Sequence, residues 1–179
     1  ITDMGQVKKI FQEFKPEVVI HCAAYTQVDK AEENRDKCML INGIGTRNIA
    51  IVSESVQAKL VYISTDYVFD GKKKNPYFEW DRPNPISVYG MSKYWGEQLV
   101  QQFSSKFFIL RTAWLYGKEG NNFVKTIQKL AQEKTELKIV NDQIGSPTST
   151  CELSKAIKSL INTDLYGIYH ASCEDQCSW

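Results

Sequence analysis

The chain has 179 residues, of which 42% are hydrophobic and 24% are charged, so it is long enough to form a globular domain with its own core. A formal net charge of +1 gives no general attraction to a nucleic acid polymer or an anionic membrane. No apolar run reaches the ~20 residues that span a bilayer. The five cysteines do not form two separated pairs of ligands, so we expect no metal site. We expect their thiols to be reduced, as in a cytoplasmic protein, and Cys22 and Cys38 to be buried.

The first third of the chain predicts a helix, a strand and a longer helical stretch. Residues 6–15 form the helix, which Pro16 ends, because apolar side chains recur at the spacing of one helical face: Val7, Ile10, Phe11 and Phe14. The apolar run Val18–Ile20 is a short strand, and the following His21 fits a core histidine better than a catalyst. Residues 29–55 predict a long helix, in one or two pieces, with these residues facing inward: Ile41, Ile44, Ile49 and Val52.

The stretch that organises the chain begins with a buried strand at Leu60–Ile63. Ser64, Thr65 and Asp66 follow it directly, so two hydroxyls and a carboxylate lie at its carboxyl end. Because ligands bind at that edge of open α/β sheets, we predict a site there.

A helix then runs from Tyr89 to about Phe103, and Lys93 shares one of its faces with Tyr89 because the two are four residues apart. A phenol in water has a pKa of about 10, and a neighbouring ammonium favours the phenolate and lowers that pKa. The pair could then act as an acid–base group near neutral pH. A hydroxyl at the neighbouring strand end, such as that of Thr65, would hold a substrate oxygen against the phenol.

The rest of the chain predicts three more strands and two more helices. Strand Lys106–Leu110 leads to Trp114 on the same rim as Thr65, where position alone is equally consistent with stacking on a sugar and with packing in a core. The other predicted elements are a helix from Asn121 with Ile127, Leu130 and Ala131 inward, a strand at Leu137–Val140, a polar loop at 142–148, a helix at 150–161 capped by Ser149 or Thr150, and a strand at Tyr166–Ala171.

This alternation of strands and helices implies an α/β fold, a Rossmann-like parallel sheet with helices on both faces. The G-x-x-G-x-x-G fingerprint of the first strand, turn and helix of that fold is absent. Residues 43–45 read Gly-Ile-Gly, but they have no third glycine and do not directly follow a strand.

Thr65, Tyr89 and Lys93 resemble the Ser/Thr–Tyr–Lys set of the extended short-chain dehydrogenase/reductases. A YxxxK pair alone is weak evidence. Longer segments, spread over essentially the whole chain, resemble the dTDP-4-dehydrorhamnose reductases of that superfamily: VIHCAAYTQVDKAE (19–32), YISTDYVFDG (62–71), NPISVYGMSK (84–93), ILRTAWLYG (109–117) and DQIGSPT (142–148).

The resemblance implies reduction of the C4 ketone of dTDP-4-dehydro-L-rhamnose to dTDP-L-rhamnose with NADPH or NADH. Tyr89 would donate the proton, Lys93 would hold the ribose hydroxyls and lower the pKa of Tyr89, and Thr65 would bind the ketone oxygen. A nucleotide-sugar substrate and a homodimer are the expected partners, and Asn42 is a candidate support for the lysine. Further site residues implied are Ala24, Tyr25, Thr26 and Ile63 for the cofactor and Asp66 and Trp114 for the substrate.

We hypothesise that the chain is an internal fragment that lacks the fingerprint strand. Residues 1–117 would be a partial Rossmann domain, and residues 118–179 a mixed Rossmann and substrate-binding portion that is truncated at its C-terminal end. Because glycine amides and helix N-termini hold the pyrophosphate, such a chain should bind NAD(P)H weakly. It should also expose a sheet edge at Val18–Ile20.

Two other functions stay open at this point. One is a non-catalytic regulatory subunit of the methionine adenosyltransferase type, which resembles the same reductases. The other is a sugar-nucleotide epimerase or dehydratase, although dehydratases usually place acidic residues directly after the strand-end threonine, where this chain has Asp66 and then Tyr67. For the chain taken by itself, an α/β domain without activity is the remaining alternative.

Overall fold

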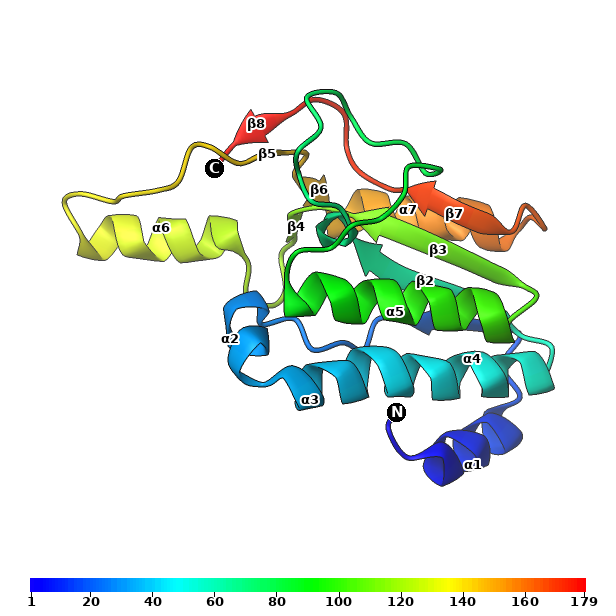
Figure 1. The fold of residues 1–179 in the computed structure, drawn as a ribbon. Coiled ribbons are helices and arrows are strands. Elements are labelled where there is room, and N and C mark those ends of the chain that lie inside the picture. The colour runs from blue at the N-terminus through cyan, green and yellow to red at the C-terminus, as the bar shows by residue number, and fades with distance from the viewer.

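The computed structural model describes residues 1–179, and its centre is a four-stranded sheet in which every pairing is parallel (Figure 1). The strand order is β1-β2-β3-β7, and the bounds are Val18–His21, Lys59–Thr65, Phe107–Thr112 and Gly167–His170. The predicted parallel α/β sheet is therefore confirmed, and β1 lies at an edge of it as expected.

Helices cover both faces of the sheet, because side chains along each strand alternate between two apolar clusters. One face packs Leu60 and Tyr62 of β2 against three helices, α1 (Met4–Phe14), α4 (Thr46–Ser55) and α5 (Val88–Phe103). The opposite face packs against a single helix.

That helix is α7 (Thr150–Ile161), and it contributes Leu153 and Ile157 to the second cluster. Its N-cap is Ser149, one of the two predicted residues, whose hydroxyl accepts a hydrogen bond from the N–H of Glu152 at 3.1 Å. The two clusters bury β2 and β3 on both sides.

The predicted helix at 29–55 forms in four consecutive pieces: α2 (Val28–Glu33), α3 (Arg35–Met39), a π-helical turn (Leu40–Gly45) and α4. Gly43 in the π turn lies against the ring of Trp95 on α5, and a Cβ there would be 2.0 Å from the indole Cε3. Glycine at that position therefore allows α5 to lie close to the π turn. Such turns are frequent at functional sites.

A second close approach brings α5 onto β2. A Cβ at Gly96 would lie 2.3 Å from the hydroxyl of Tyr62 and 2.8 Å from the carbonyl oxygen of Asn42. The start of α5 is set by Ser87, whose side chain accepts from the N–H of Gly90 at 3.0 Å. These contacts determine how the Tyr89–Lys93 turn faces the end of β2.

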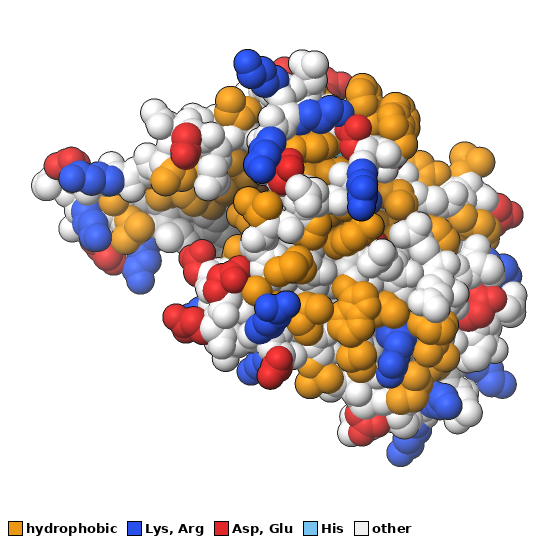
Figure 2. Space-filling model, viewed as in Figure 1, with side chains coloured by type: hydrophobic (Ala, Val, Ile, Leu, Met, Phe, Trp, Pro, Cys, Tyr) orange, Lys and Arg blue, Asp and Glu red, His pale blue; other side chains and the backbone are white.

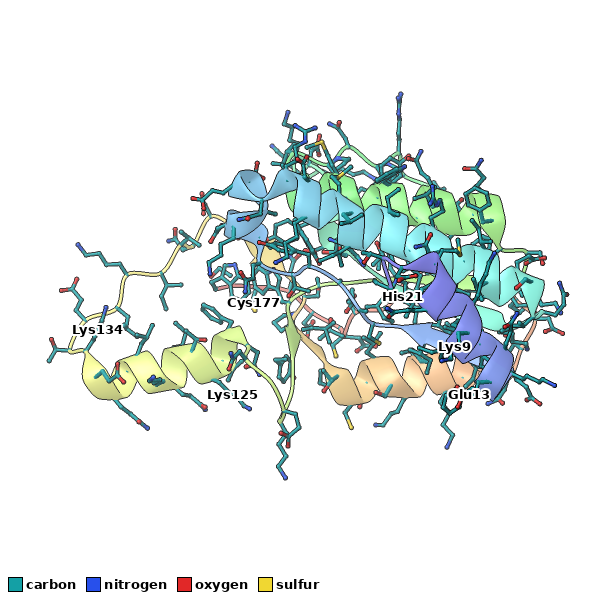
Figure 3. The ribbon with its side chains drawn as sticks, turned by 90° about the horizontal axis from the view of Figure 1, so that it is seen from below. Lys9, Glu13, His21, Lys125, Lys134 and Cys177 are labelled. Carbon is teal, nitrogen blue, oxygen red and sulfur yellow. The ribbon has the colours of Figure 1, made fainter.

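The segment after β3 forms smaller elements. Strand β4 (Leu115–Tyr116) pairs with β6 (Thr148–Ser149), and β5 (Ile144–Gly145) pairs with β8 (Cys177–Ser178). Between them, α6 (Phe123–Glu133) projects from the rest of the chain, with Lys125 and Lys134 marking its two ends (Figures 1 and 3).

Several predictions for these peripheral elements are wrong. No α6 residue is buried, and Ala131 is exposed although Ile127 and Leu130 are half-buried. Residues 137–140 form no strand, since no neighbouring strand pairs with them. Ile10 and Phe14 are exposed because α1 packs chiefly on α4 at the sheet edge, so that only Val7 and Phe11 reach the core. Cys22 is also exposed, whereas Cys38 is buried.

The face shown in Figure 2 carries acidic and basic side chains interspersed with patches of hydrophobic atoms. No helix combines the length and the apolar character needed to cross a membrane.

Gly96→Ala should lower the free energy of unfolding of the complete gene product by about 1–3 kcal/mol, the usual cost of overpacking, although alanine favours a helix more than glycine does. The matched control is Gly5→Ala in α1, where the only neighbour is the Asp3 carboxylate at 3.2 Å, and this change should cost less than Gly96→Ala. Urea unfolding of both variants measures the difference. Equal stabilisation by the two substitutions would contradict the packing described for α5.

Candidate active site

The site begins at Thr65, the last residue of β2, where the strand opens into a short 3-10 turn at Asp66–Val68. The Thr65 hydroxyl accepts from the N–H of Tyr67 at 3.2 Å and donates to the Asp66 carboxylate at 3.0 Å. Burial raises the pKa of Asp66. The hydroxyl is thus held at the carboxyl end of a central strand, the edge predicted for ligands.

Tyr89 lies in the first turn of α5 with its phenol directed at this strand end. Burial raises its pKa to about 12, with hydrogen bonding to Thr65 acting in the opposite direction and the neighbouring Asp66 adding to the rise. Its ring also meets that of Tyr67 edge to face, with centroids 5.7 Å apart. The phenol of Tyr89 and the hydroxyl of Thr65 are therefore neighbours, from elements that lie more than twenty residues apart in sequence.

Lys93 lies one turn further along α5 and is 3% exposed. Its ammonium donates to the carbonyl oxygen of Ile63 at 2.7 Å and lies 4.0 Å from the ring centroid of Tyr62. Burial lowers the pKa of Lys93 to about 7, and the Glu97 carboxylate opposes that change. The ammonium makes a hydrogen bond to only one protein oxygen, which leaves donors for a further ligand.

The expectation that Lys93 lowers the pKa of Tyr89 is wrong for this structure. The ammonium is directed at the Ile63 carbonyl, and burial of the phenol outweighs any effect of the lysine. Each group is shifted toward its neutral form, since burial penalises a charge on either.

The loop after β1 is held by Asn42, which lies in the π turn. Its side-chain oxygen accepts from the N–H of Tyr25 at 2.7 Å, and its amide donates to the carbonyl of Tyr25 at 3.1 Å and to the hydroxyl of Ser92 at 2.8 Å. Asn42 therefore ties the loop to α5 next to Lys93, and makes no hydrogen bond with the lysine itself.

The three predicted cofactor residues of this loop, Ala24, Tyr25 and Thr26, line a polar cavity of about 400 Å³ together with Gln27, Lys30, Asn34 and Lys37. Tyr89 and Lys93 do not line this cavity. A second cavity, of about 580 Å³, lies between α7 and residues 171–174, away from the site. No group of three or more His, Cys, Asp or Glu side chains is arranged to hold a metal ion.

Trp114 follows β3 in a left-handed backbone conformation, with φ of 46°. Its indole stacks on that of Trp179 with centroids 3.6 Å apart, and Gly145 lies against it, since a Cβ there would be 2.6 Å from the Trp114 ring. One face of Trp114 is thus covered, and a sugar could meet only the rest of the ring. Trp179 had no signal in the sequence, because it lies 65 residues away and the stacking depends on the pairing of β5 with β8.

A buried ion pair beside the site also escaped prediction. Arg111 of β3 makes two hydrogen bonds to Glu97 of α5, at 2.9 and 2.8 Å, and Ser64 donates to the same carboxylate at 2.5 Å. Arg111 and Glu97 lie 14 positions apart, on a strand and a helix, so only the folded chain brings them together.

His21 (labelled in Figure 3) ends β1 and is 4% exposed. Its Nε2 hydrogen-bonds the hydroxyl of Thr46 at 3.0 Å. Burial lowers its pKa to about 3, and the positive charge of Lys93 adds to this. The reading of His21 as a core histidine is therefore confirmed.

The whole chain, residues 1–179, matches the model of a family described as RmlD substrate binding domain. The spore coat polysaccharide biosynthesis protein SpsK of Bacillus subtilis is 46% identical over 100% of this chain and 63% of its own length. The dTDP-4-dehydrorhamnose reductase of Escherichia coli is 38% identical over 97% of this chain and 60% of its own length.

Among solved structures, the dTDP-4-dehydrorhamnose reductase of Bacillus anthracis in complex with NADP superimposes with a TM-score of 0.97 and 54% identity, covering 99% of this chain and 64% of that one. The chain thus spans about three fifths of the length of the relatives that it matches.

A buried neutral His21 makes stability depend on pH. Its folded pKa of about 3 lies below the unfolded value of 6.5, so the unfolded state takes up more protons between these values and stability falls as pH drops through that window. Relative to His21→Gln, the complete gene product should lose about 2 kcal/mol of unfolding free energy between pH 7 and pH 5. Urea unfolding at both pH values measures this, and parallel behaviour of the two proteins would mean that His21 is not buried in neutral form.

Proposed function

Since this chain belongs to the RmlD substrate binding domain family, we propose that its protein is an NAD(P)H-dependent dTDP-4-dehydrorhamnose reductase. The reaction would reduce the C4 ketone of dTDP-4-dehydro-L-rhamnose to dTDP-L-rhamnose. The observation that carries the proposal is that Tyr89 lies beside Thr65 at the end of β2 while Lys93 bonds Ile63 of the same strand, in a chain 54% identical to a reductase solved with NADP.

The residues around Lys93 fit a nicotinamide cofactor. The buried ammonium donates to one carbonyl, that of Ile63, and retains donors that suit the hydroxyls of a ribose. Asn42 holds the backbone of Tyr25 through two hydrogen bonds, so the loop of Ala24 to Thr26 is tied to the π turn. The cofactor, when bound, supplies the hydride that adds to the ketone carbon.

The side chains of the chain itself would handle the proton and the oxygen. With a pKa of about 12, Tyr89 is protonated at neutral pH and is therefore suited to donate a proton to the alkoxide that forms. The hydroxyl of Thr65 would hold the same oxygen. Lys93, whose donors are not all used by the carbonyl of Ile63, would hold the ribose hydroxyls of the cofactor rather than act on the phenol.

Asp66 and Trp114 are the proposed contacts to the nucleotide-sugar substrate. Asp66 adjoins Thr65 through a hydrogen bond, and the uncovered part of the Trp114 ring would meet the sugar or the base. A homodimer and a cytoplasmic location remain sequence predictions that belong to this proposal.

Neither alternative function is favoured. The relatives with substantial identity are named as reductases or as a polysaccharide biosynthesis protein, which supports reduction rather than regulation of a methionine adenosyltransferase. The likeness to a dTDP-glucose 4,6-dehydratase is at 19% identity and concerns the fold alone.

Tyr89→Phe in the complete gene product should lower turnover by roughly 10²–10⁴-fold, since a phenylalanine has no proton to donate. NADP⁺ binding, measured by calorimetry, should change little. NADPH oxidation with dTDP-4-dehydro-L-rhamnose gives the rate. Tyr94→Phe, on the same helix, is the matched control and should keep its activity. A Tyr89→Phe protein with near-normal turnover would rule out the assigned role.

A further inference from the structure

We propose that Glu97 is a positioning residue for the Tyr89–Lys93 pair, in that its carboxylate fixes α5 against the ends of β2 and β3 and places a negative charge beside the lysine. The inference rests on the proposed function only in assuming that Lys93 binds the cofactor. The position of the charge itself follows from the contacts of Glu97.

These contacts join three elements within the core. One carboxylate oxygen of Glu97 accepts from Ser64 of β2 at 2.5 Å and from Nε of Arg111 at 2.9 Å, and the other accepts from Nη2 of Arg111 at 2.8 Å. Glu97 has no exposed surface, and the two partners are 3–4% exposed. A bidentate, charge-assisted pair of this kind restricts both distance and orientation.

The same arginine also fixes the loop that carries Asp66. Its Nη1 donates to the carbonyl of Glu79 at 3.3 Å, and its guanidinium lies 5.1 Å from the ring centroid of Phe69. The Glu79 carboxylate in turn accepts from the N–H of His170 on β7 at 3.1 Å. The helix, two strands and the loop therefore meet at one ion pair behind the site.

Glu97 lies one helical turn from Lys93 on the same face of α5, and both side chains are buried. Other polar groups around the ammonium come from several elements: Cys22 and His21 at the end of β1, Cys38 on α3 and Tyr62 on β2. Among the charges that raise the pKa of Lys93, that of Glu97 acts most strongly. Without it, the lysine would lose its proton at a lower pH.

The packing role and the charge role can be separated by substitution. Glu97→Gln removes the charge but leaves Arg111 without a full partner, and such a buried unpaired charge can prevent folding. The double substitution Glu97→Met with Arg111→Met replaces the pair by apolar side chains of similar volume, which is often tolerated. Ser64→Ala removes one hydrogen bond and keeps the charge. Glu54→Gln, at a carboxylate that hydrogen-bonds Ser105 far from the site, is the matched control.

The experiment follows the titration of Lys93 in the complete gene product by NMR of ¹³C-labelled lysine, with the signal assigned by its loss in Lys93→Met. The midpoint should lie near pH 7 in the unsubstituted protein and fall in Glu97→Gln, which loses one negative charge. It should fall less in the double variant, which loses one charge of each sign, and stay in place in Ser64→Ala and Glu54→Gln. NADP⁺ affinity at pH 7 should fall in Glu97→Gln with the lost fraction of charged lysine, by about fivefold if the midpoint falls by about one pH unit.

An unshifted midpoint in folded Glu97→Gln, or in the double variant if Glu97→Gln does not fold, would overturn the inference and leave Glu97 with a packing role only. Because the titration needs neither substrate nor turnover, its result is independent of the reductase assignment. A shifted midpoint in a protein without reductase activity would reject the proposed function and keep this inference.

Discussion

The site depends on the contact between α5 and β2. Gly96 lets the helix approach Tyr62, and one residue later Glu97 enters the core to meet Ser64 and Arg111. Burying two charges is costly, so the pair is stable only because its geometry is bidentate and a hydroxyl satisfies part of the carboxylate. With the helix at this depth, Tyr89 and Lys93 must face the end of β2.

The π turn has a corresponding role on the other side of α5. Gly43 allows Trp95 to lie against it, and Asn42 connects the backbone of Tyr25 to Ser92. An α-helical turn would direct these side chains differently, since the register of residues around the helix axis changes with a π turn. The loop proposed to line the cofactor is thereby fixed to the helix that carries the proposed proton donor.

The sequence predicted the elements that have strong local patterns and buried partners. The apolar run before Thr65 was sufficient to predict β2, and the spacing of Tyr89 and Lys93 was sufficient to place both on one face of α5. A central strand and an amphipathic helix are specified by local sequence patterns. The prediction of a strand at 137–140 was wrong, because a strand needs a partner strand and the periodicity of a sequence does not reveal one. The stacking of Trp179 on Trp114 and the raised pKa of Tyr89 depend on contacts and burial that arise only in the folded chain.

The central claim is that hydride and proton are added to a sugar ketone at this edge of the sheet. The most direct measurement uses NADPH deuterated at both C4 positions of the nicotinamide, with dTDP-4-dehydro-L-rhamnose and the complete gene product, and locates the label by NMR and mass spectrometry. The account predicts dTDP-L-rhamnose that carries a single deuterium at C4 of the sugar. An unlabelled product, a label at another carbon, or no reduction at all would contradict it.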